Sequence, residues 1–82
     1  MNKSSLYVAR DDWEYDICSG FKSYLDACLY RQECQMVWIN HSDYVWLIVE
    51  NDKWQIVKKI NLTRLSNEQV EKELEGTGIP MK

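Results

Sequence analysis

Residues 35–62 read QMVWINHSDYVWLIVENDKWQIVKKINL, and the expected architecture follows mainly from this stretch. Apolar and polar residues alternate through much of it, which is the period of a β-strand. Short polar segments at His41-Ser42 and Asn51-Asp52 divide the stretch, and such segments suit tight antiparallel turns. The stretch therefore predicts a three-stranded antiparallel meander made of Gln35–Asn40, Tyr44–Glu50 and Trp54–Leu62.

The residues before the meander predict a hairpin followed by a helix. Ser5–Arg10 is rich in β-branched and aromatic residues, and Trp13–Cys18 alternates between apolar and polar side chains. Over Phe21–Cys34 the apolar spacing changes to that of a helix. The stripe expected to face the core consists of Phe21, Leu25, Cys28, Leu29 and Gln32.

A capping box marks the start of a second helix near the C-terminus. Ser66 and Gln69 stand three residues apart, so each side chain can bond to the backbone N–H group of the other. We expect a helix over Asn67–Glu75 that stops at Gly76, since glycine readily adopts the conformation that ends a helix. Residues 77–82 are expected to form a flexible tail.

These elements predict one small α+β domain. The expected order is ββαβββα, with antiparallel strands, over residues 1–82. A chain of 82 residues leaves room for a single core. The composition is 45% hydrophobic with four Trp and five Tyr, which supplies apolar surface for that core and excludes disorder of the whole chain.

Charge, hydropathy and cysteine content favour a cytoplasmic protein. Thirteen acidic and ten basic residues leave a formal charge of -3, which exerts no long-range attraction on nucleic acid or an anionic membrane. No apolar segment typical of a signal peptide follows the N-terminus, and the longest apolar run, Tyr44–Val49, is far shorter than the ~20 residues of a membrane span. The three cysteines are an odd number and are expected to be reduced thiols.

No motif for catalysis, cofactor binding or metal binding is recognised. The single histidine, His41, falls in a predicted turn and has no accompanying Ser/His/Asp set. Cys18, Cys28 and Cys34 lack the close pairing that positions two sulfurs on a zinc ion. The three glycines do not form a phosphate-binding loop. We therefore expect a non-enzymatic protein without cofactor or metal.

The predicted meander is apolar on both faces. Two-residue turns would place Leu47 opposite Met36 and Ile56. An antiparallel sheet with one wet face would alternate apolar with polar residues, so the second face needs a cover. The cover is either the N-terminal hairpin of the same chain or another molecule. The candidate partner-binding face consists of Val37, Ile39, Tyr44, Trp46, Ile48, Val57 and Lys59.

This aromatic face predicts a protein–protein interaction module that acts as an inhibitor, an antitoxin-like partner or an adaptor. Small, acidic, tryptophan-rich domains of this kind are common among proteins that phages and mobile elements encode. Two alternatives stay open. A nucleic-acid-binding module would use Lys53, Lys58, Lys59 and Arg64 together with Trp54. A self-associating structural protein would pair its second sheet face across a two-fold axis.

The expected order αβββα over residues 21–75 is similar to that of double-stranded-RNA-binding domains. The resemblance implies a lysine cluster at the start of the last helix, where that family contacts phosphates. Here Ser66–Glu71 carries carboxylates instead, and these would repel phosphate. We therefore expect another protein, or a second copy of this one, to be the partner.

Overall fold

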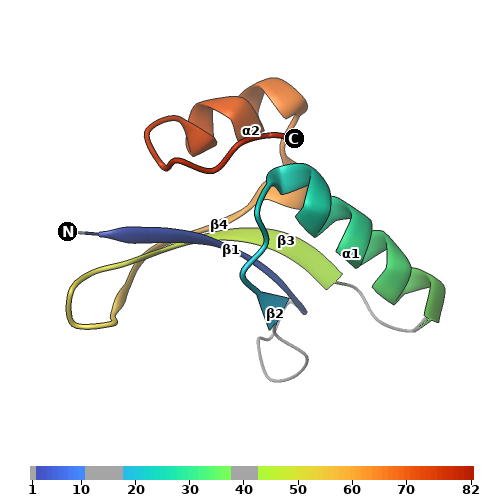
Figure 1. Cartoon of the computed structure of the whole chain (residues 1–82), viewed down its shortest axis with the longest axis horizontal. Coiled ribbons are helices and arrows are strands. Elements are labelled where there is room, and N and C mark those ends of the chain that lie inside the picture. The colour runs from blue at the N-terminus through green and yellow to red at the C-terminus, as the bar shows by residue number, and fades with distance from the viewer. Residues whose placement is uncertain (1, 11–17, 38–42) are drawn as a thin grey trace.

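The computed structural model describes residues 2–10, 18–37 and 43–82 (Figure 1). The elements along the chain are β1 (Lys3–Arg10), β2 (Cys18–Ser19), α1 (Tyr24–Val37), β3 (Asp43–Glu50), β4 (Ile56–Asn61), the 3-10 helix η1 (Leu62–Arg64) and α2 (Asn67–Leu74). The strands form one antiparallel sheet in the order β2-β1-β3-β4. The expected α+β class is confirmed. Within the described ranges, no helix has the length and apolar character needed to cross a membrane.

One of the two neighbours of β3 in the sheet is β1, whose residues were expected to form a separate hairpin. The two strands pair along their whole length, from Lys3 opposite Glu50 to Arg10 opposite Asp43. The predicted register is wrong, because Leu47 lies opposite Leu6 and Ile60 instead of Met36 and Ile56. The meander was predicted from the spacing of side chains along each strand. That spacing does not show which strands pair when they are far apart in the chain.

The end of α1 takes the place of the strand predicted over Gln35–Asn40. The helix continues through Val37, and residues 38–42 lie outside the described chain together with the predicted turn at His41-Ser42. Over the described residues the order from α1 to α2 is therefore αββα, and not the αβββα order that resembles double-stranded-RNA-binding domains. Each residue that extends an existing helix adds one backbone hydrogen bond. This gain favours the helix over a strand at residues 35–37, where the sequence pattern for a strand is weak.

The first helix begins later than its apolar spacing predicts. Ser23 caps it, because the Ser23 hydroxyl accepts a hydrogen bond from the Asp26 backbone N–H group at 3.2 Å. Phe21 therefore precedes α1 and packs against the core from the connecting segment. Of the strand predicted over Trp13–Cys18, only Cys18 is described, and it lies in β2 beside Val8.

The face of α1 that packs on the sheet is also different from the predicted one. Ala27 is completely buried, and the small side chain lets the helix approach the sheet closely. Leu25 and Leu29, which were expected in the core, are 45% and 49% exposed. The prediction is wrong for Leu25 and Leu29, whose place on the inner face is taken by Ala27 and Tyr24. Phe21 and Cys28 of the predicted stripe do pack against the core.

Both helices cover the same face of the sheet, and the main core lies between them and the strands (Figure 1). Every element except β2 and β4 contributes a buried residue to this core. The buried cluster consists of Leu6, Val8, Ala27, Val45, Leu47, Leu62, Val70 and Leu74.

The predicted capping box of α2 is confirmed. The Gln69 backbone N–H group donates to the Ser66 hydroxyl at 3.3 Å, and the Ser66 backbone N–H group donates to Gln69 Oε1 at 3.1 Å. The helix ends at Leu74, shortly before Gly76, whose φ of 76° is a conformation that glycine adopts without steric cost.

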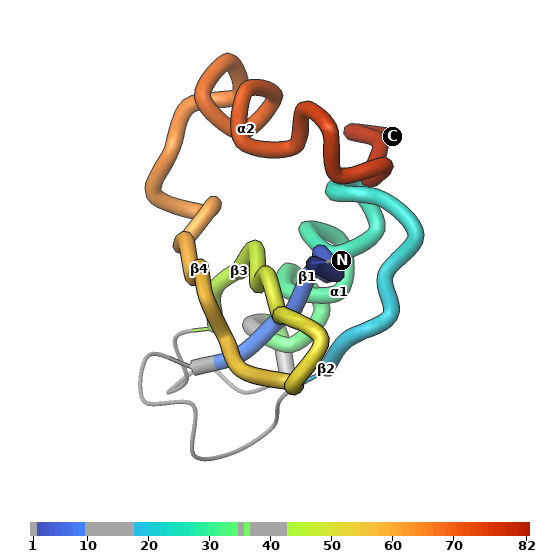
Figure 2. Tube along the Cα trace, turned by 90° about the vertical axis from the view of Figure 1, so that its left-hand side faces the viewer, coloured from blue at the N-terminus to red at the C-terminus, as the bar shows by residue number. Residues whose placement is uncertain are grey.

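Residues 77–82, expected as a flexible tail, fold back beside the start of α1 (Figure 2). The carbonyl oxygens of Pro80 and Met81 accept hydrogen bonds from the backbone N–H groups of Tyr24 and Leu25, each at 2.9 Å. The first N–H groups of a helix have no partner inside the helix, so these two bonds satisfy groups that would otherwise need water. The C-terminal segment thus belongs to the folded domain.

Candidate functional site

The structure brings most of the candidate partner-binding residues onto the sheet face that points away from the helices, which we call the outer face. Val37 lies in α1 and not in the sheet, and Ile39 lies outside the described residues. The strand register places the others on or beside the outer face: Tyr44, Trp46 and Ile48 alternate along β3, Lys59 lies opposite Ile48, and Val57 lies at a bulge in β4.

Side chains of the same chain close the centre of the outer face. The Lys59 ammonium group lies 4.8 Å from the centre of the Trp46 ring. On the other side, the Tyr7 hydroxyl donates a hydrogen bond to Glu50 Oε1 at 3.3 Å. By the strand register, Ile48 lies between these two diagonal contacts, and it is 0% exposed. The centre of the predicted binding face is therefore buried within the monomer.

The two aromatic residues of the predicted face also have partners within the chain. The Trp46 indole N–H group donates to the Ala9 carbonyl oxygen at 3.2 Å. The rings of Tyr44 and Trp46 meet edge to face, with 6.4 Å between centres and an interplanar angle of 78°. The Arg64 guanidinium lies 5.5 Å from the centre of the Tyr44 ring, within the range of a cation–π contact. Both rings therefore already make contacts within the folded chain, and less of their surface is left for a partner.

Large exposed apolar side chains of the described residues lie in two places, on α1 (Leu25, Leu29 and Met36) and at the hairpin between β3 and β4. Trp54 is 75% exposed, and Ile56 and Val57 are each 54% exposed. We call these three residues the hairpin patch. Large apolar side chains that stand together in solvent are typical of a surface that contacts another molecule. Of this patch, only Val57 belongs to the predicted partner-binding face, whereas Trp54 was expected to serve the nucleic-acid alternative.

Asn51 shapes the loop that carries Trp54. Its Oδ1 atom accepts hydrogen bonds from the backbone N–H groups of Lys53 and Gln55, at 2.9 and 3.0 Å. Trp54 has a φ of 63°, a left-handed conformation that costs a bulky residue about 1 to 3 kcal/mol. This loop differs from the two-residue turn expected at Asn51-Asp52, although asparagine at the start of a turn is a signal for such side-chain bonds.

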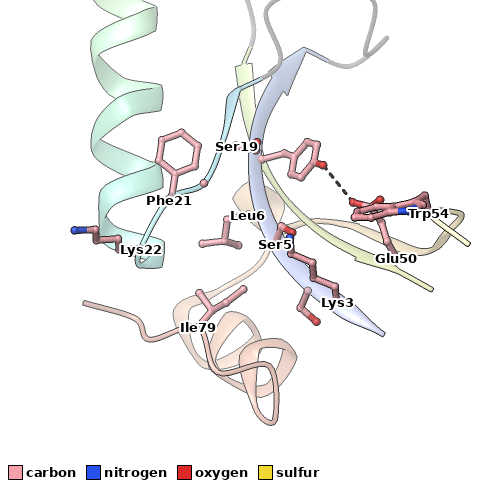
Figure 3. Close-up of a pocket in the computed structure, with 12 residues that line it drawn as sticks. Lys3, Ser5, Leu6, Ser19, Phe21, Lys22, Glu50, Trp54 and Ile79 are labelled. Atoms are coloured by element: carbon pink, nitrogen blue, oxygen red, sulfur yellow. Dashed lines mark hydrogen bonds between the residues drawn. The ribbon is translucent and has the colours of Figure 1, made fainter. Parts of the chain in front are cut away.

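A groove of about 480 Å³ runs along the edge of β1 (Figure 3). We call it the edge groove. It begins where β2 ends, because β2 pairs only with Tyr7 and Val8. No local pattern in the sequence predicts this groove, since its walls come from segments far apart in the chain. Its lining includes Lys3, Leu6, Phe21, Lys22, Trp54 and Ile79.

Three of the four basic residues of the nucleic-acid alternative are engaged within the chain, and the fourth, Lys53, is exposed in the loop before β4. Lys58 forms an ion pair with Glu73, with 3.1 Å between Nζ and Oε2. Lys59 and Arg64 lie over the rings of Trp46 and Tyr44. A phosphate would have to compete with these contacts, so the geometry does not favour nucleic-acid binding.

The cysteines Cys18, Cys28 and Cys34 are free thiols. The Cys18 sulfur lies 2.9 Å from the hydroxyl oxygen of Tyr30, close enough for a hydrogen bond in either direction. Burial raises the pKa of the Cys34 thiol, which disfavours the reactive thiolate. Within the described ranges, no three His, Cys, Asp or Glu side chains gather closely enough to hold a metal ion.

Burial and hydrogen bonds keep several tyrosine hydroxyls protonated. Burial, with a smaller contribution from a hydrogen bond to Cys28, raises the pKa of Tyr24 to about 12. A hydrogen bond to Cys18, then one to Cys34, then burial raise the pKa of Tyr30. These groups stay neutral in the folded chain at a pH where an exposed tyrosine would ionise.

The raised tyrosine pKa values predict that the folded state loses stability at alkaline pH. An unfolded tyrosine ionises near pH 10, whereas folded Tyr24 holds its proton to about pH 12. Between these values the folded state binds more protons, so the free energy of unfolding falls as the pH rises. Urea titrations from pH 7 to 11 should show a constant midpoint up to about pH 9 and a falling one above it. Tyr24→Phe should reduce the fall, and a flat profile to pH 11 would contradict the assignment.

Comparison of the chain with protein-family models, with curated proteins and with solved structures finds no match. A functional proposal therefore depends on the surfaces described above.

Proposed function

We propose that the chain is a small, non-enzymatic protein-binding module that acts as an inhibitor, an antitoxin-like partner or an adaptor. The hairpin patch forms the centre of its binding surface. The observation that carries this proposal is the exposure of Trp54, which is 75% accessible at the tip of a hairpin. Tryptophan is among the residues most enriched at the energetic centres of protein interfaces.

The energetics of the loop support a binding role for Trp54. Its left-handed backbone and its exposed ring both cost free energy in the isolated chain, and the ring gains little burial in return. A partner that covers the ring would recover this burial. Residues in unusual backbone conformations are found more often at functional sites than elsewhere.

The proposal includes a cytoplasmic location for the protein. The three cysteines are free thiols in the structure, and such thiols persist in reducing compartments. Cys34 is further protected because burial raises the pKa of its thiol.

Replacing Trp54 by alanine is expected to abolish most of the binding and to leave the fold intact. Removal of an interface tryptophan costs about 2 kcal/mol or more of association free energy, which is a loss of roughly 30-fold. The measurement is capture of partners from native lysate by tagged protein, quantified by mass spectrometry beside urea unfolding of each variant. Met36→Ala is the matched control, because Met36 is 78% exposed on α1, away from the hairpin.

Several outcomes would contradict the proposal. Partners that bind wild type and Trp54→Ala equally would place the binding surface elsewhere. A sedimentation experiment that shows a dimer lost in Trp54→Ala would favour self-association. A salt-sensitive gel shift with DNA or RNA that Lys59→Glu removes would favour the nucleic-acid alternative.

A further inference from the structure

We propose that the edge groove binds an extended, acidic segment of the partner, which adds to the sheet as a strand beside residues Lys3–Leu6 of β1. This inference rests on the proposed protein-binding function and specifies how the partner is recognised and by what chemistry. Strand addition to an open sheet edge supplies affinity through backbone hydrogen bonds and specificity through alternate side chains.

The first half of β1 is an open edge. On one side β1 pairs with β3 along its whole length, but on the other side β2 reaches only Tyr7 and Val8. The chain then turns away at Gly20, which has a φ of 86°. In the part of the chain that the structure describes, no strand pairs with Lys3–Leu6 on this side. An unpaired edge presents backbone groups that can pair with another chain.

The strand register shows which backbone groups face the groove. The Val45 N–H group donates to the Thr63 hydroxyl at 2.8 Å, so the backbone of Val45 points toward the β4 side and away from β1. In an antiparallel pair of strands, two opposite residues either exchange backbone hydrogen bonds or direct their backbone N–H and C=O groups away from each other. The two kinds of residue pair alternate along the strands. Val8 lies opposite Val45, so the backbone N–H and C=O groups of Val8 point away from β3. The same alternation turns the N–H groups of Ser4 and Leu6 toward the edge groove.

The walls of the groove suit alternate side chains of an added strand. Figure 3 shows Leu6, Phe21 and Ile79 on one side of β1 and Trp54 on the other. Successive side chains of a strand point to opposite faces, so an added strand would contact the apolar wall and the Trp54 side in turn. The four open residues span about 13 Å at roughly 3.3 Å per residue, which is enough for a short strand.

The charge of the groove favours an acidic segment. Lys3 and Lys22 both line it, and among the described residues neither has a carboxylate within ion-pair distance. The one acidic residue of the lining, Glu50, accepts the hydrogen bond from the Tyr7 hydroxyl. A second copy paired antiparallel over the same four residues would add its own Lys3 to the groove and no carboxylate, since Lys3–Leu6 contains no acidic residue. A carboxylate-bearing segment of a different protein therefore fits the groove better.

The test uses a defined probe, an acetylated and amidated hexapeptide of alternating Glu and Val. Backbone amide signals of the 15N-labelled protein are followed by NMR as this peptide is added. We expect saturable shifts at Ser4, Leu6 and Lys22. A matched peptide with Lys in place of Glu should bind at least about 10-fold more weakly, since the lysines of the groove repel it. A Glu/Val peptide with N-methylated backbone at alternate residues should fail to bind.

Two protein variants separate strand addition from other modes of binding. Ser4→Pro removes the outward N–H group and leaves the β1·β3 hydrogen bonds in place, because proline is tolerated on the open side of an edge strand. It should weaken peptide binding at least about 10-fold with little change in the urea midpoint, whereas Ser4→Ala should bind as wild type does. Lys22→Glu should reverse the preference between the Glu and Lys peptides.

Each contrary result has a distinct meaning. An absence of saturable shifts at Ser4 and Leu6 at millimolar peptide overturns strand addition, and so does equal binding of the N-methylated peptide. A captured partner that Trp54→Ala releases but Ser4→Pro retains leaves the protein-binding function standing and overturns only the edge groove. A dimer that Ser4→Pro dissociates would make a second copy the occupant and would overturn the acidic segment.

Discussion

Replacing Ile48 by alanine is expected to lower the free energy of unfolding by about 2 to 4 kcal/mol, although Ile48 lies on the sheet face away from both helices. Ile48 is 0% exposed and lies between the Tyr7–Glu50 hydrogen bond and the Lys59–Trp46 contact. The substitution removes apolar contacts and leaves a cavity that these side chains cannot fill without giving up their own contacts.

The matched control for this change is Ile56→Ala. The same atoms are removed on the neighbouring strand, but Ile56 is 54% exposed and its environment can collapse around alanine. Its expected cost is below about 1 kcal/mol. Urea unfolding of the two variants beside wild type measures the difference. Equal and small losses of unfolding free energy in the two variants would show that the centre of the outer face does not stabilise the fold.

The same experiment tests whether the centre of the outer face is structural or is free to bind a partner. If Ile48→Ala unfolds more easily while the sedimentation of the wild type is that of a monomer, the centre of the outer face is structural. A partner would then contact the hairpin patch and the edge groove at its margin. Trp54 contributes to both surfaces.

The largest expected loss of stability follows replacement of Leu47 by alanine, at about 3 to 5 kcal/mol. Leu47 is 1% exposed, points toward the helices, and lies opposite Leu6 and Ile60 in the centre of the sheet. Small domains are stable by only about 5 to 15 kcal/mol, so this variant should be partly unfolded near its working temperature. Thermal and urea unfolding monitored by circular dichroism provide the measurement.

Leu29→Ala is the matched control for Leu47→Ala and also tests the face of α1. The periodicity of the sequence predicts that Leu29 faces the core, whereas the structure leaves it 49% exposed. Its loss should therefore stay below about 1 kcal/mol. A loss as large as that of Leu47→Ala would show that α1 packs with the predicted stripe inward.

Features that depend on neighbours in the sequence were predicted well. The apolar run within Tyr44–Glu50 corresponds to β3, and the β-branched and aromatic residues of Ser5–Arg10 lie within β1. The capping box at Ser66 and Gln69 marks the start of α2. These signals come from backbone geometry and hydrogen bonds within a few residues, so the local sequence contains all of the necessary information.

The candidate site could be predicted only in part. The sequence indicated an unusual aromatic strand and correctly placed Tyr44, Trp46 and Ile48 on one face of it, because side chains alternate along a strand. It could not show that Lys59 and Arg64 lie over the two rings. It assigned Trp54 to the nucleic-acid alternative and not to the partner-binding face, because the exposure of this ring depends on a loop conformation that Asn51 stabilises.

The α+β class, the strand β3 and the start of α2 follow from interactions between near neighbours in the chain, so they could be predicted. The position of β1 beside β3, the packing of Ala27 instead of Leu29 on the sheet, and the open edge of β1 emerge only in the folded chain. These features depend on free energies of contact between residues far apart in the chain. Such contacts override local preferences of a few tenths of a kcal/mol per residue.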